Sequence, residues 1–321
     1  MPTLIVISDP AEPLLAMLKD LPSGTAMAVG ATPEAFENIA PQADAILNWA
    51  FSGAVLRQVL GMCPRLRWVH ARAAGLDNIL FPALVESSAL LTNGSGIFGE
   101  SLGEYALAAM LYFAKDLRRM IRGQESAVWD PFDVEMISGK TVGVIGYGDL
   151  GRAVASRSRA LGMHALVVKR HAPPAPGGDG VASAVYGPEG LLRVLSRSDY
   201  VVVTAPLTPE TRGMIGEPEF AVMKPGAVIV NVGRGPIIDE AAMLRALAEK
   251  RIKGAALDVF DREPLPADHP FYKLDNVLLS PHCADHTPNW ESYAMRLFLE
   301  QFERFSKGEP LLNVVNKKLG Y

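Results

Sequence analysis

Residues 141–162 read TVGVIGYGDLGRAVASRSRALG, which is a short apolar run, a glycine-rich turn and a helical pattern. Gly146, Gly148 and Gly151 form a G-x-G-x-x-G motif directly after the run VGVI. Glycine permits a tight turn there and lets backbone N–H groups approach a pyrophosphate at the positive end of the following helix. The motif alone could be an ordinary turn, but the preceding strand and the following helix together favour a dinucleotide site. We assign that site to Gly146, Tyr147, Gly148, Asp149, Leu150 and Gly151.

On both sides of this motif, short runs rich in Val, Ile and Leu alternate with longer helical patterns. This alternation is typical of parallel sheets covered by helices, so the predicted fold class is α/β. A single long helix is expected over residues 102–121, between two series of strands. The first series is expected at residues 4–8, 26–29, 45–48, 68–71 and near 91, and the second begins at 141 and continues at 164–168, 200–204, 227–232, 254–259 and 276–280.

The last predicted helix, residues 290–307, has no new strand to cover, so we expect it to return to the first series. The sequence thus predicts two doubly wound, Rossmann-like parallel-sheet domains, of which the first is discontinuous. Residues 1–97 and the returning segment 287–321 would form a substrate domain, and residues 98–286 a dinucleotide-binding domain. A length of 321 residues agrees with two domains at ~100–200 residues each.

Composition excludes several classes of protein. Lys and Arg total 31 against 35 for Asp and Glu, a formal net charge of −4 without a basic run, so no nucleic-acid partner is expected. The longest uncharged apolar stretch, residues 105–114, is shorter than the ~20 residues that span a bilayer. Cys63 and Cys283 are too few for a disulfide framework, and no Cys/His cluster has metal-site spacing. We expect a cytoplasmic protein with no membrane partner and no metal site.

The strand that follows the glycine motif ends in two cations, Lys169 and Arg170. An NAD site normally places an acid about 20 residues after the motif to bind the ribose 2′-hydroxyl, but no acid occurs between Asp149 and Asp179. We therefore expect nothing near this strand end to repel a phosphate, and we predict NADP(H) as the cofactor. Lys169 and Arg170 would hold the 2′-phosphate through charge-assisted hydrogen bonds. The alternative is a solvated basic strand end in a protein that uses either cofactor.

Five stretches together carry a family resemblance: GKTVGVIGYGDLGRAVA (139–155), TAPLTPETRGMI (204–215), VIVNVGRGPIIDE (228–240), GAALDVFDREPLP (254–266) and NVLLSPH (276–282). Over nearly its whole length the chain resembles the D-isomer-specific 2-hydroxyacid dehydrogenases, in particular their glyoxylate/hydroxypyruvate reductase-like branch. The resemblance implies an oxidoreductase that reduces a small 2-keto acid to a D-2-hydroxy acid. It further implies a Rossmann-like fold. The cofactor predicted from the strand end stays NADP, with NAD as the possible alternative.

By the same resemblance, the catalytic residues are Arg234, Glu263 and His282. The chemistry needs such groups: a cation to anchor the carboxylate and polarise the ketone, an acid to protonate the new alkoxide, and a carboxylate to hold that acid in its charged form. Each residue alone could be an ordinary surface or core residue. All three, however, follow predicted parallel strands at the edge where open α/β sheets bind ligands.

The resemblance also implies cofactor and substrate contacts. Asp258 would receive the nicotinamide carboxamide, with a plain strand-end cap as the alternative. Backbone N–H groups near Ala74 and Gly75 would hold the substrate carboxylate, and substrate would also contact Arg234 and His282. Trp49 is either a substrate-facing aromatic or a core residue. The remaining cofactor contacts would be Thr204, Ala205, Pro206, Val232 and Gly233, and Ser95 and Gly96 resemble hinge positions.

Two alternatives stay open at this stage. The same fold serves nucleotide-sensing, corepressor-like binding proteins, and other family members are phosphonate or phosphoglycerate dehydrogenases. A homodimer is predicted from the long helix, whose apolar residues suggest a contact face: Tyr105, Leu107, Met110 and Leu111.

Overall fold

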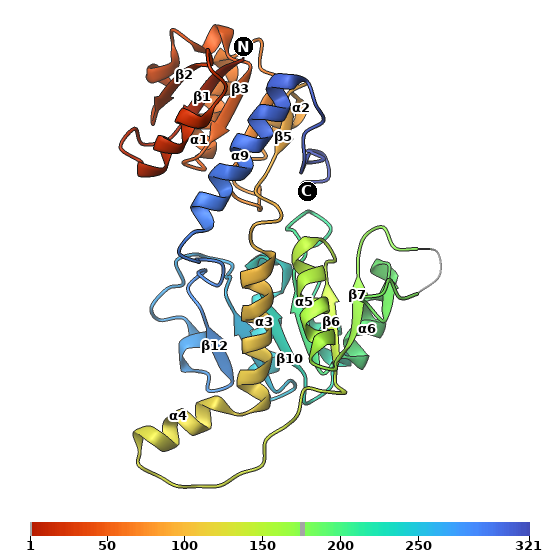
Figure 1. The fold of residues 1–321 in the computed structure, drawn as a ribbon. Helices are drawn as coiled ribbons and strands as arrows, with labels where there is room; N and C mark the ends of the chain where they lie inside the picture. Colours follow the sequence, from red (N-terminus) through yellow and green to blue (C-terminus); the bar gives the residue numbers. More distant parts are fainter. Residues whose placement is uncertain (1, 174–176) are drawn as a thin grey trace. The chain divides into compact units, whose positions relative to one another are not determined.

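The computed structural model describes residues 2–173 and 177–321, which divide into two compact units. Unit 1 contains the chain up to Ile97 together with Thr287–Tyr321, and unit 2 is Phe98–His286. Each unit is built on its own sheet, in which all neighbouring strands pair in parallel (Figure 1). The predicted α/β class, with doubly wound parallel sheets, is confirmed.

Unit 1 has a five-stranded sheet in the order β2-β1-β3-β4-β5. In the interior strand Thr3–Ile7, Leu4, Ile5, Val6 and Ile7 are all 0% exposed, as expected for a strand covered on both faces. The strands are β1 (Thr3–Ile7), β2 (Ala26–Gly30), β3 (Ala45–Asn48), β4 (Trp68–Ala71) and β5 (Leu90–Thr92). Its other elements are η1 (Pro13–Asp20), η2 (Pro33–Phe36), η3 (Ala40–Gln42), α1 (Gly53–Met62) and α2 (Pro82–Glu86).

The last helix, α9 (Trp290–Lys307), packs on the sheet of unit 1 (Figure 1). The Phe298 ring stacks on Trp68 of β4 with the ring centroids 5.6 Å apart, and the Phe302 ring lies 6.2 Å from the same indole. Aromatic rings in such contacts bury large apolar areas. A helix distant in sequence therefore completes one core of this unit.

Unit 2 has a seven-stranded sheet in the order β12-β11-β10-β9-β6-β7-β8. Helices α3 and α5 cover one of its faces (Figure 1), and α6, α7 and α8 contribute to the core on the other. The strands are β6 (Thr141–Ile145), β7 (His164–Val168), β8 (Ala184–Tyr186), β9 (Tyr200–Val203), β10 (Val228–Asn231), β11 (Gly254–Leu257) and β12 (Val277–Leu279). The helices are α3 (Gly99–Ala114), α4 (Leu117–Glu125), α5 (Asp149–Ala160), α6 (Leu191–Arg197), α7 (Glu217–Val222) and α8 (Glu240–Ala248), with short turns η4 (Pro188–Gly190), η5 (Gly235–Ile237) and η6 (Pro270–Lys273).

Because the strands of unit 2 are parallel, they all end at one edge of the sheet, which we call the carboxyl edge. Strand β6 lies between β7 and β9, so the strand order reverses beside the glycine-rich turn. Open α/β sheets bind ligands at this switch point. The topology therefore places the glycine motif where a dinucleotide would bind.

Several predicted elements differ from those observed. The single helix expected over residues 102–121 is two helices, because Asp116 adopts a left-handed conformation (φ 47°) and caps α4 through a bond from the Arg119 N–H at 3.4 Å. The helix predicted near residues 11–20 begins at Pro13 and is a 3-10 helix. Strand β8 is absent from the predicted set.

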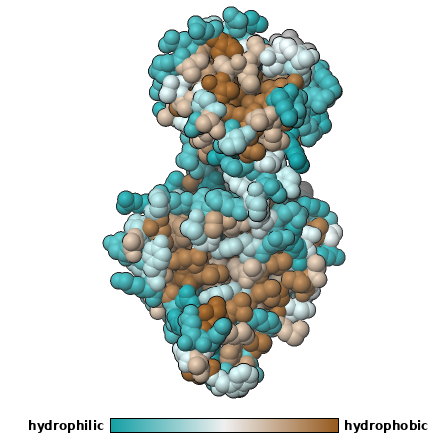
Figure 2. All heavy atoms as spheres, turned by 60° about the vertical axis from the view of Figure 1, so that its left-hand side comes forward, coloured by the Kyte–Doolittle hydropathy of each residue, from teal (hydrophilic) through white to brown (hydrophobic). Residues whose placement is uncertain are grey.

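The predicted contact face on the long helix is also partly wrong. Met110 is 0% exposed and belongs to the core of unit 2. Exposed apolar side chains lie instead on α4 and the segment after it, including Met120 (44%), Ile121 (50%) and Trp129 (95%). Figure 2 shows apolar side chains gathered on the displayed surface.

Candidate active site

The glycine-rich turn between β6 and α5 is closely packed on the end of β9. Gly146 has φ +99°, and a Cβ there would lie 2.5 Å from the Ala205 nitrogen, while a Cβ at Gly151 would overlap the Gly146 carbonyl. The Thr204 hydroxyl donates to that carbonyl at 2.7 Å. These contacts exclude larger side chains at both positions.

Gly148, by contrast, faces open space, since a Cβ there would meet no atom within 4 Å. It caps the N-terminus of α5, and among the described residues no side chain bonds to this end of the helix. Uncapped N–H groups at a helix N-terminus suit a phosphate. This turn therefore fits the pyrophosphate of a dinucleotide.

Two further residues of the turn, Tyr147 and Asp149, point to protein partners. The Tyr147 hydroxyl donates to Asp179 Oδ2 at 3.1 Å, and Arg152 Nη1 donates to the same oxygen at 2.9 Å. Backbone N–H donation, chiefly from Ala182, lowers the pKa of Asp179 to about 2. The Asp149 carboxylate lies against Gly99, where a Cβ would be 2.6 Å from Oδ2. Tyr147 thus ties the turn to the segment that contains Asp179, and Asp149 packs against Gly99.

At the end of β7, Arg170 contacts an acid that the local sequence does not show. Its Nη2 donates to Glu210 Oε2 at 2.8 Å and lies 3.5 Å from Thr208 Oγ1. Glu210 belongs to the segment that follows β9, so it reaches Arg170 across the end of β6. The expectation that nothing near this strand end would repel a phosphate is therefore wrong. Lys169 lies beside Arg170 and is half-buried.

Glu263 and His282 are in direct contact at the carboxyl edge. His282 Nδ1 lies 2.6 Å from Glu263 Oε2, and the other carboxylate oxygen accepts the Phe260 N–H at 2.9 Å. The imidazole is 42% exposed and the carboxylate 35%. Because the carboxylate holds the hydrogen on Nδ1, the second ring nitrogen, Nε2, is the one that can exchange a proton with a substrate.

Arg234 lies at the same edge, in the turn after β10. The turn is shaped by Asn231, whose Nδ2 donates to the Arg234 carbonyl at 3.0 Å and whose Oδ1 accepts the Gly233 N–H at 3.1 Å. Arg234 Nη1 donates to the Gly233 carbonyl at 2.8 Å. Arg234, Glu263 and His282 follow the adjacent strands β10, β11 and β12, so three distant stretches of chain meet at one edge. Asn231 was not singled out from the sequence, although an amide at a strand end is a common turn signal.

Asp258, directly after β11, is 2% exposed and organises the segment after His282. Its Oδ1 accepts the backbone N–H groups of Cys283 at 3.0 Å and Ala284 at 3.2 Å. This geometry matches the strand-end cap that was the alternative from sequence. Nearby, burial raises the pKa of the Tyr105 hydroxyl, and the negative charge of Asp258 adds a smaller increase.

The remaining predicted cofactor contacts lie at the ends of two neighbouring strands. Thr204, Ala205 and Pro206 follow β9, and Val232 and Gly233 follow β10. The Val232 N–H donates to the Val203 carbonyl at 3.2 Å, which keeps the two strand ends paired. All five residues therefore share the carboxyl edge with the glycine-rich turn.

In unit 1 the predicted substrate loop follows β4. Asn93 Nδ2 donates to the Ala74 carbonyl at 2.7 Å, and the Gly94 N–H donates to the Ala73 carbonyl at 3.1 Å. These bonds hold the loop that contains Gly75. Beside the predicted hinge residue Ser95, Gly96 has φ +94°.

Trp49 lies inside unit 1, with 1% of its surface exposed. The Arg72 guanidinium carbon is 5.3 Å from the centroid of its ring and equally far from that of Trp290, and Arg72 Nη1 donates to Glu291 Oε1 at 3.1 Å. A tryptophan with almost no exposed surface lies in the core, and the guanidinium of Arg72 covers its ring. The packing therefore favours the core alternative for Trp49.

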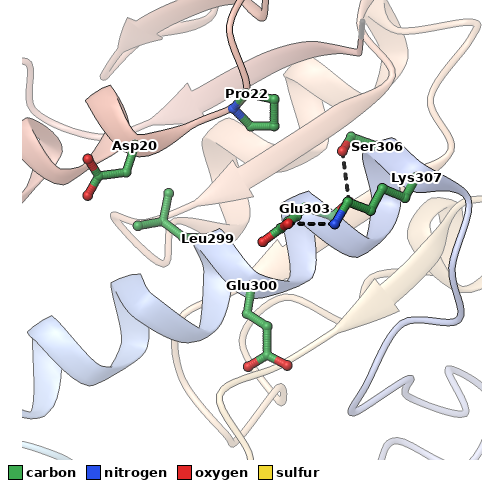
Figure 3. A pocket seen from close by; sticks show the side chains of 7 residues that line it. All are labelled: Asp20, Pro22, Leu299, Glu300, Glu303, Ser306 and Lys307. Atoms are coloured by element: carbon green, nitrogen blue, oxygen red, sulfur yellow. Dashed lines mark hydrogen bonds and ion pairs between the residues drawn. The ribbon is translucent and has the colours of Figure 1, made fainter.

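A surface hollow on unit 1 offers no comparable chemistry. Figure 3 shows it between α9 and the residues that precede β2. Lys307 donates to Glu303 Oε1 at 2.6 Å, so these two charges of the hollow satisfy each other along the helix. Within residues 2–173 and 177–321, no group of three or more His, Cys, Asp or Glu side chains could hold a metal ion, and no helix is long and apolar enough to cross a membrane.

Comparison with known proteins gives a consistent result. A family model described as "D-isomer specific 2-hydroxyacid dehydrogenase, NAD binding domain" matches residues 107–284. A glyoxylate reductase from Korarchaeum cryptofilum is 35% identical over 274 residues, which are 82% of this chain and 80% of that protein. A D-3-phosphoglycerate dehydrogenase from Methanocaldococcus jannaschii is 33% identical over 316 residues. That alignment covers 97% of this chain but 59% of the relative, so the chain spans less than two thirds of that relative's length.

Among solved structures, the chain is similar to an NADPH-dependent glyoxylate/hydroxypyruvate reductase from Sinorhizobium meliloti in complex with NADP and sulfate. The TM-score is 0.85, the identity is 27%, and both chains are covered completely (100%). The similarity thus extends over both units.

Proposed function

Because the chain belongs to the D-isomer-specific 2-hydroxyacid dehydrogenase family, we propose that it reduces a small 2-keto acid to the D-2-hydroxy acid. The observation that carries this proposal is the 2.6 Å contact between His282 Nδ1 and Glu263 at the carboxyl edge of unit 2. A histidine held by a carboxylate and open to solvent is suited to proton transfer. Arg234 follows the strand next to that of Glu263 and supplies the cation that a 2-keto acid needs.

The reaction assigns one task to each side chain. A bound nicotinamide dinucleotide would supply the hydride for the keto carbon. His282 would donate a proton from Nε2 to the oxygen that becomes the hydroxyl, and Glu263 would stabilise the charged imidazole. Arg234 would bind the carboxylate and the keto oxygen, where negative charge develops. In the reverse direction, His282 would act as the base.

For the cofactor, we infer a preference for NADP(H) over NAD(H). The glycine-rich turn fits a pyrophosphate, and Lys169 and Arg170 stand at the end of β7, where an adenosine ribose is held in this fold. The similar S. meliloti reductase is described as NADPH-dependent. Arg170 would have to exchange Glu210 for the 2′-phosphate.

For the substrate, we propose glyoxylate or hydroxypyruvate, since the K. cryptofilum and S. meliloti proteins carry these activities in their names. The similarity to a phosphoglycerate dehydrogenase supports a phosphorylated 2-keto acid as the second candidate. A panel of 2-keto acids with NADPH and with NADH, followed by nicotinamide absorbance, tests both. We expect the fastest turnover with NADPH and a two- or three-carbon acid. No reduction of any acid with either cofactor would favour a nucleotide-binding protein without enzymatic activity.

We also propose a homodimer formed through unit 2. Its α4 helix and the following segment expose five apolar side chains, Met120, Ile121, Val128, Trp129 and Met136. A concentration of exposed apolar residues in one stretch of chain suggests an interaction surface. Light scattering should report twice the 34.5 kDa chain mass, and Ile121→Arg should shift the protein toward the monomer. A monomeric wild-type protein would contradict this proposal.

A further inference from the structure

Arg170 and Glu210 form an ion pair across the end of β6. Arg170 follows β7 and Glu210 follows β9, and these strands flank β6 on its two sides. The guanidinium Nη2 donates to the carboxylate Oε2 at 2.8 Å. The pair therefore lies at the carboxyl edge, next to the turn that would hold a dinucleotide.

The carboxylate is held in place by its own loop. The Thr208 hydroxyl, in a residue only 6% exposed, donates to Glu210 Oε2 at 2.8 Å. Thr208 is fixed in turn by Thr211, whose hydroxyl accepts the Thr208 N–H at 2.8 Å and donates to the Pro206 carbonyl at 2.7 Å. The Thr208 hydrogen bond lowers the pKa of Glu210, so the group is charged at neutral pH. A negative charge is thus directed at Arg170 by a buried hydroxyl.

This charge affects the two cofactors differently. A 2′-phosphate carries about −1.5 to −2 charges, so it competes with Glu210 for Arg170 and is repelled by the carboxylate. A 2′-hydroxyl is neutral and can donate a hydrogen bond to a carboxylate. The presence of Glu210 therefore opposes the phosphorylated cofactor and not the unphosphorylated one.

We propose that Glu210 is a cofactor-specificity residue, which competes with the 2′-phosphate for Arg170 and reduces the preference for NADP(H) over NAD(H). The proposal rests on the proposed function, in which Arg170 meets the 2′-phosphate. Because the Arg170 side chain is 26% exposed and that of Glu210 68%, solvent screens the pair, and little free energy is needed for Arg170 to change partners. The net preference for NADP(H) is then the attraction of the 2′-phosphate to Lys169 and Arg170, reduced by its repulsion from Glu210.

The test is calorimetric titration of the wild-type protein and Glu210→Gln with NADPH, NADH, 2′,5′-ADP and 5′-AMP. We expect Glu210→Gln to bind NADPH and 2′,5′-ADP about 3–10-fold more tightly, with less gain at high salt. Binding of NADH and 5′-AMP should stay the same or weaken about threefold. The fragments separate nucleotide binding from turnover.

The matched control is Glu249→Gln. Glu249 also accepts a hydrogen bond from a half-buried arginine, Arg251, at 2.7 Å, but it precedes β11 and so lies at the opposite edge of the sheet. This variant makes the same change in net charge, and it should leave all four affinities within about twofold. A gain in NADPH affinity equal to that of Glu210→Gln would overturn the proposal, because the effect would then be one of overall charge.

Arg170→Ala distinguishes failure of this proposal from failure of the proposed function. If Arg170→Ala weakens NADPH and NADH equally, the 2′-phosphate assignment itself is wrong, and the role of Glu210 falls with it. If Arg170→Ala selectively weakens NADPH but Glu210→Gln leaves NADPH unchanged or weaker, only the role of Glu210 is wrong. In the Arg170→Ala background, Glu210→Gln should increase NADPH affinity by less than half as much as it does in the wild-type protein, since the shared partner Arg170 is gone.

Discussion

Two histidines, one in each unit, occupy contrasting positions relative to a parallel strand. His70 lies within β4 of unit 1, is 0% exposed, and has Nδ1 2.7 Å from the Thr92 hydroxyl. Burial lowers the pKa of His70 to about 3, so it is neutral at physiological pH. His282 lies beyond β12 of unit 2, is 42% exposed, and pairs with the Glu263 carboxylate. A histidine inside a strand serves packing, whereas one past the strand end, partly exposed beside a carboxylate, lies where a ligand can reach it.

The strongest way to break this contrast is to remove the groups at the carboxyl edge of unit 2. His282→Ala and Arg234→Ala should each lower kcat/KM for the best 2-keto acid by at least ~100-fold, through loss of proton transfer and of charge stabilisation. Steady-state nicotinamide absorbance is the measurement. His164→Gln is the control, because His164 is exposed at the start of β7, on the opposite edge. Turnover like that of the wild type in either alanine variant would contradict the mechanism.

A smaller effect is expected from the partner of His282. Glu263→Gln keeps the size of the side chain but removes the charge, so the imidazole loses its stabilising anion and its fixed hydrogen on Nδ1. We expect kcat/KM to fall about 10–100-fold, mainly through kcat. A loss confined to KM, with kcat unchanged, would mean that Glu263 contributes to substrate binding alone.

Smaller again is the effect of the cations after β7. Neutralising both, as Lys169→Ala with Arg170→Ala, should raise the Kd of NADPH by at least ~10-fold and that of NADH by less than about twofold. Titration calorimetry measures both values. An equal loss of affinity for the two cofactors would refute the 2′-phosphate assignment. It would not contradict the fold or the predicted catalytic groups.

The smallest effect concerns the buried histidine, and it appears in stability. Because the pKa of His70 is depressed in the folded state, the unfolded chain takes up a proton first, and stability falls as pH drops from about 6.5 toward about 3. Between pH ~7 and ~5.5, wild type should lose about 1 kcal/mol more stability than His70→Asn, whose amide can keep the contact with Thr92. Denaturant unfolding followed by tryptophan fluorescence measures the difference. Equal losses in the two proteins would show that His70 does not titrate on unfolding.

Local patterns were sufficient for the fold. The G-x-G-x-x-G turn, its flanking strand and helix, and the alternation of apolar runs identify parallel α/β sheets, because main-chain geometry and apolar periodicity act over a few residues. The prediction of a single helix over residues 102–121 was wrong because one residue in it suits two local structures. Asp116 can either continue a helix or cap the next one, because its side chain accepts the Arg119 N–H at the start of α4.

Other features depend on residues that are remote along the chain. The local sequence around Lys169 and Arg170 has no acid, yet Glu210 reaches Arg170 from 40 residues away. Likewise, Met110 belongs to an apolar helix face that looks free in sequence and is covered in the folded unit. No window of neighbouring residues contains these contacts.

From its sequence alone, this protein is determined to be an α/β chain of two parallel sheets with a dinucleotide-type turn, since backbone preferences and apolar spacing are local properties. Only the tertiary structure decided that His282 meets Glu263, that Asp258 caps the segment after His282, and that Arg170 already has an anionic partner. The physical reason is that parallel strands gather their ends at one edge. Charges far apart in the chain become neighbours there, and their electrostatic interactions depend on distance in space.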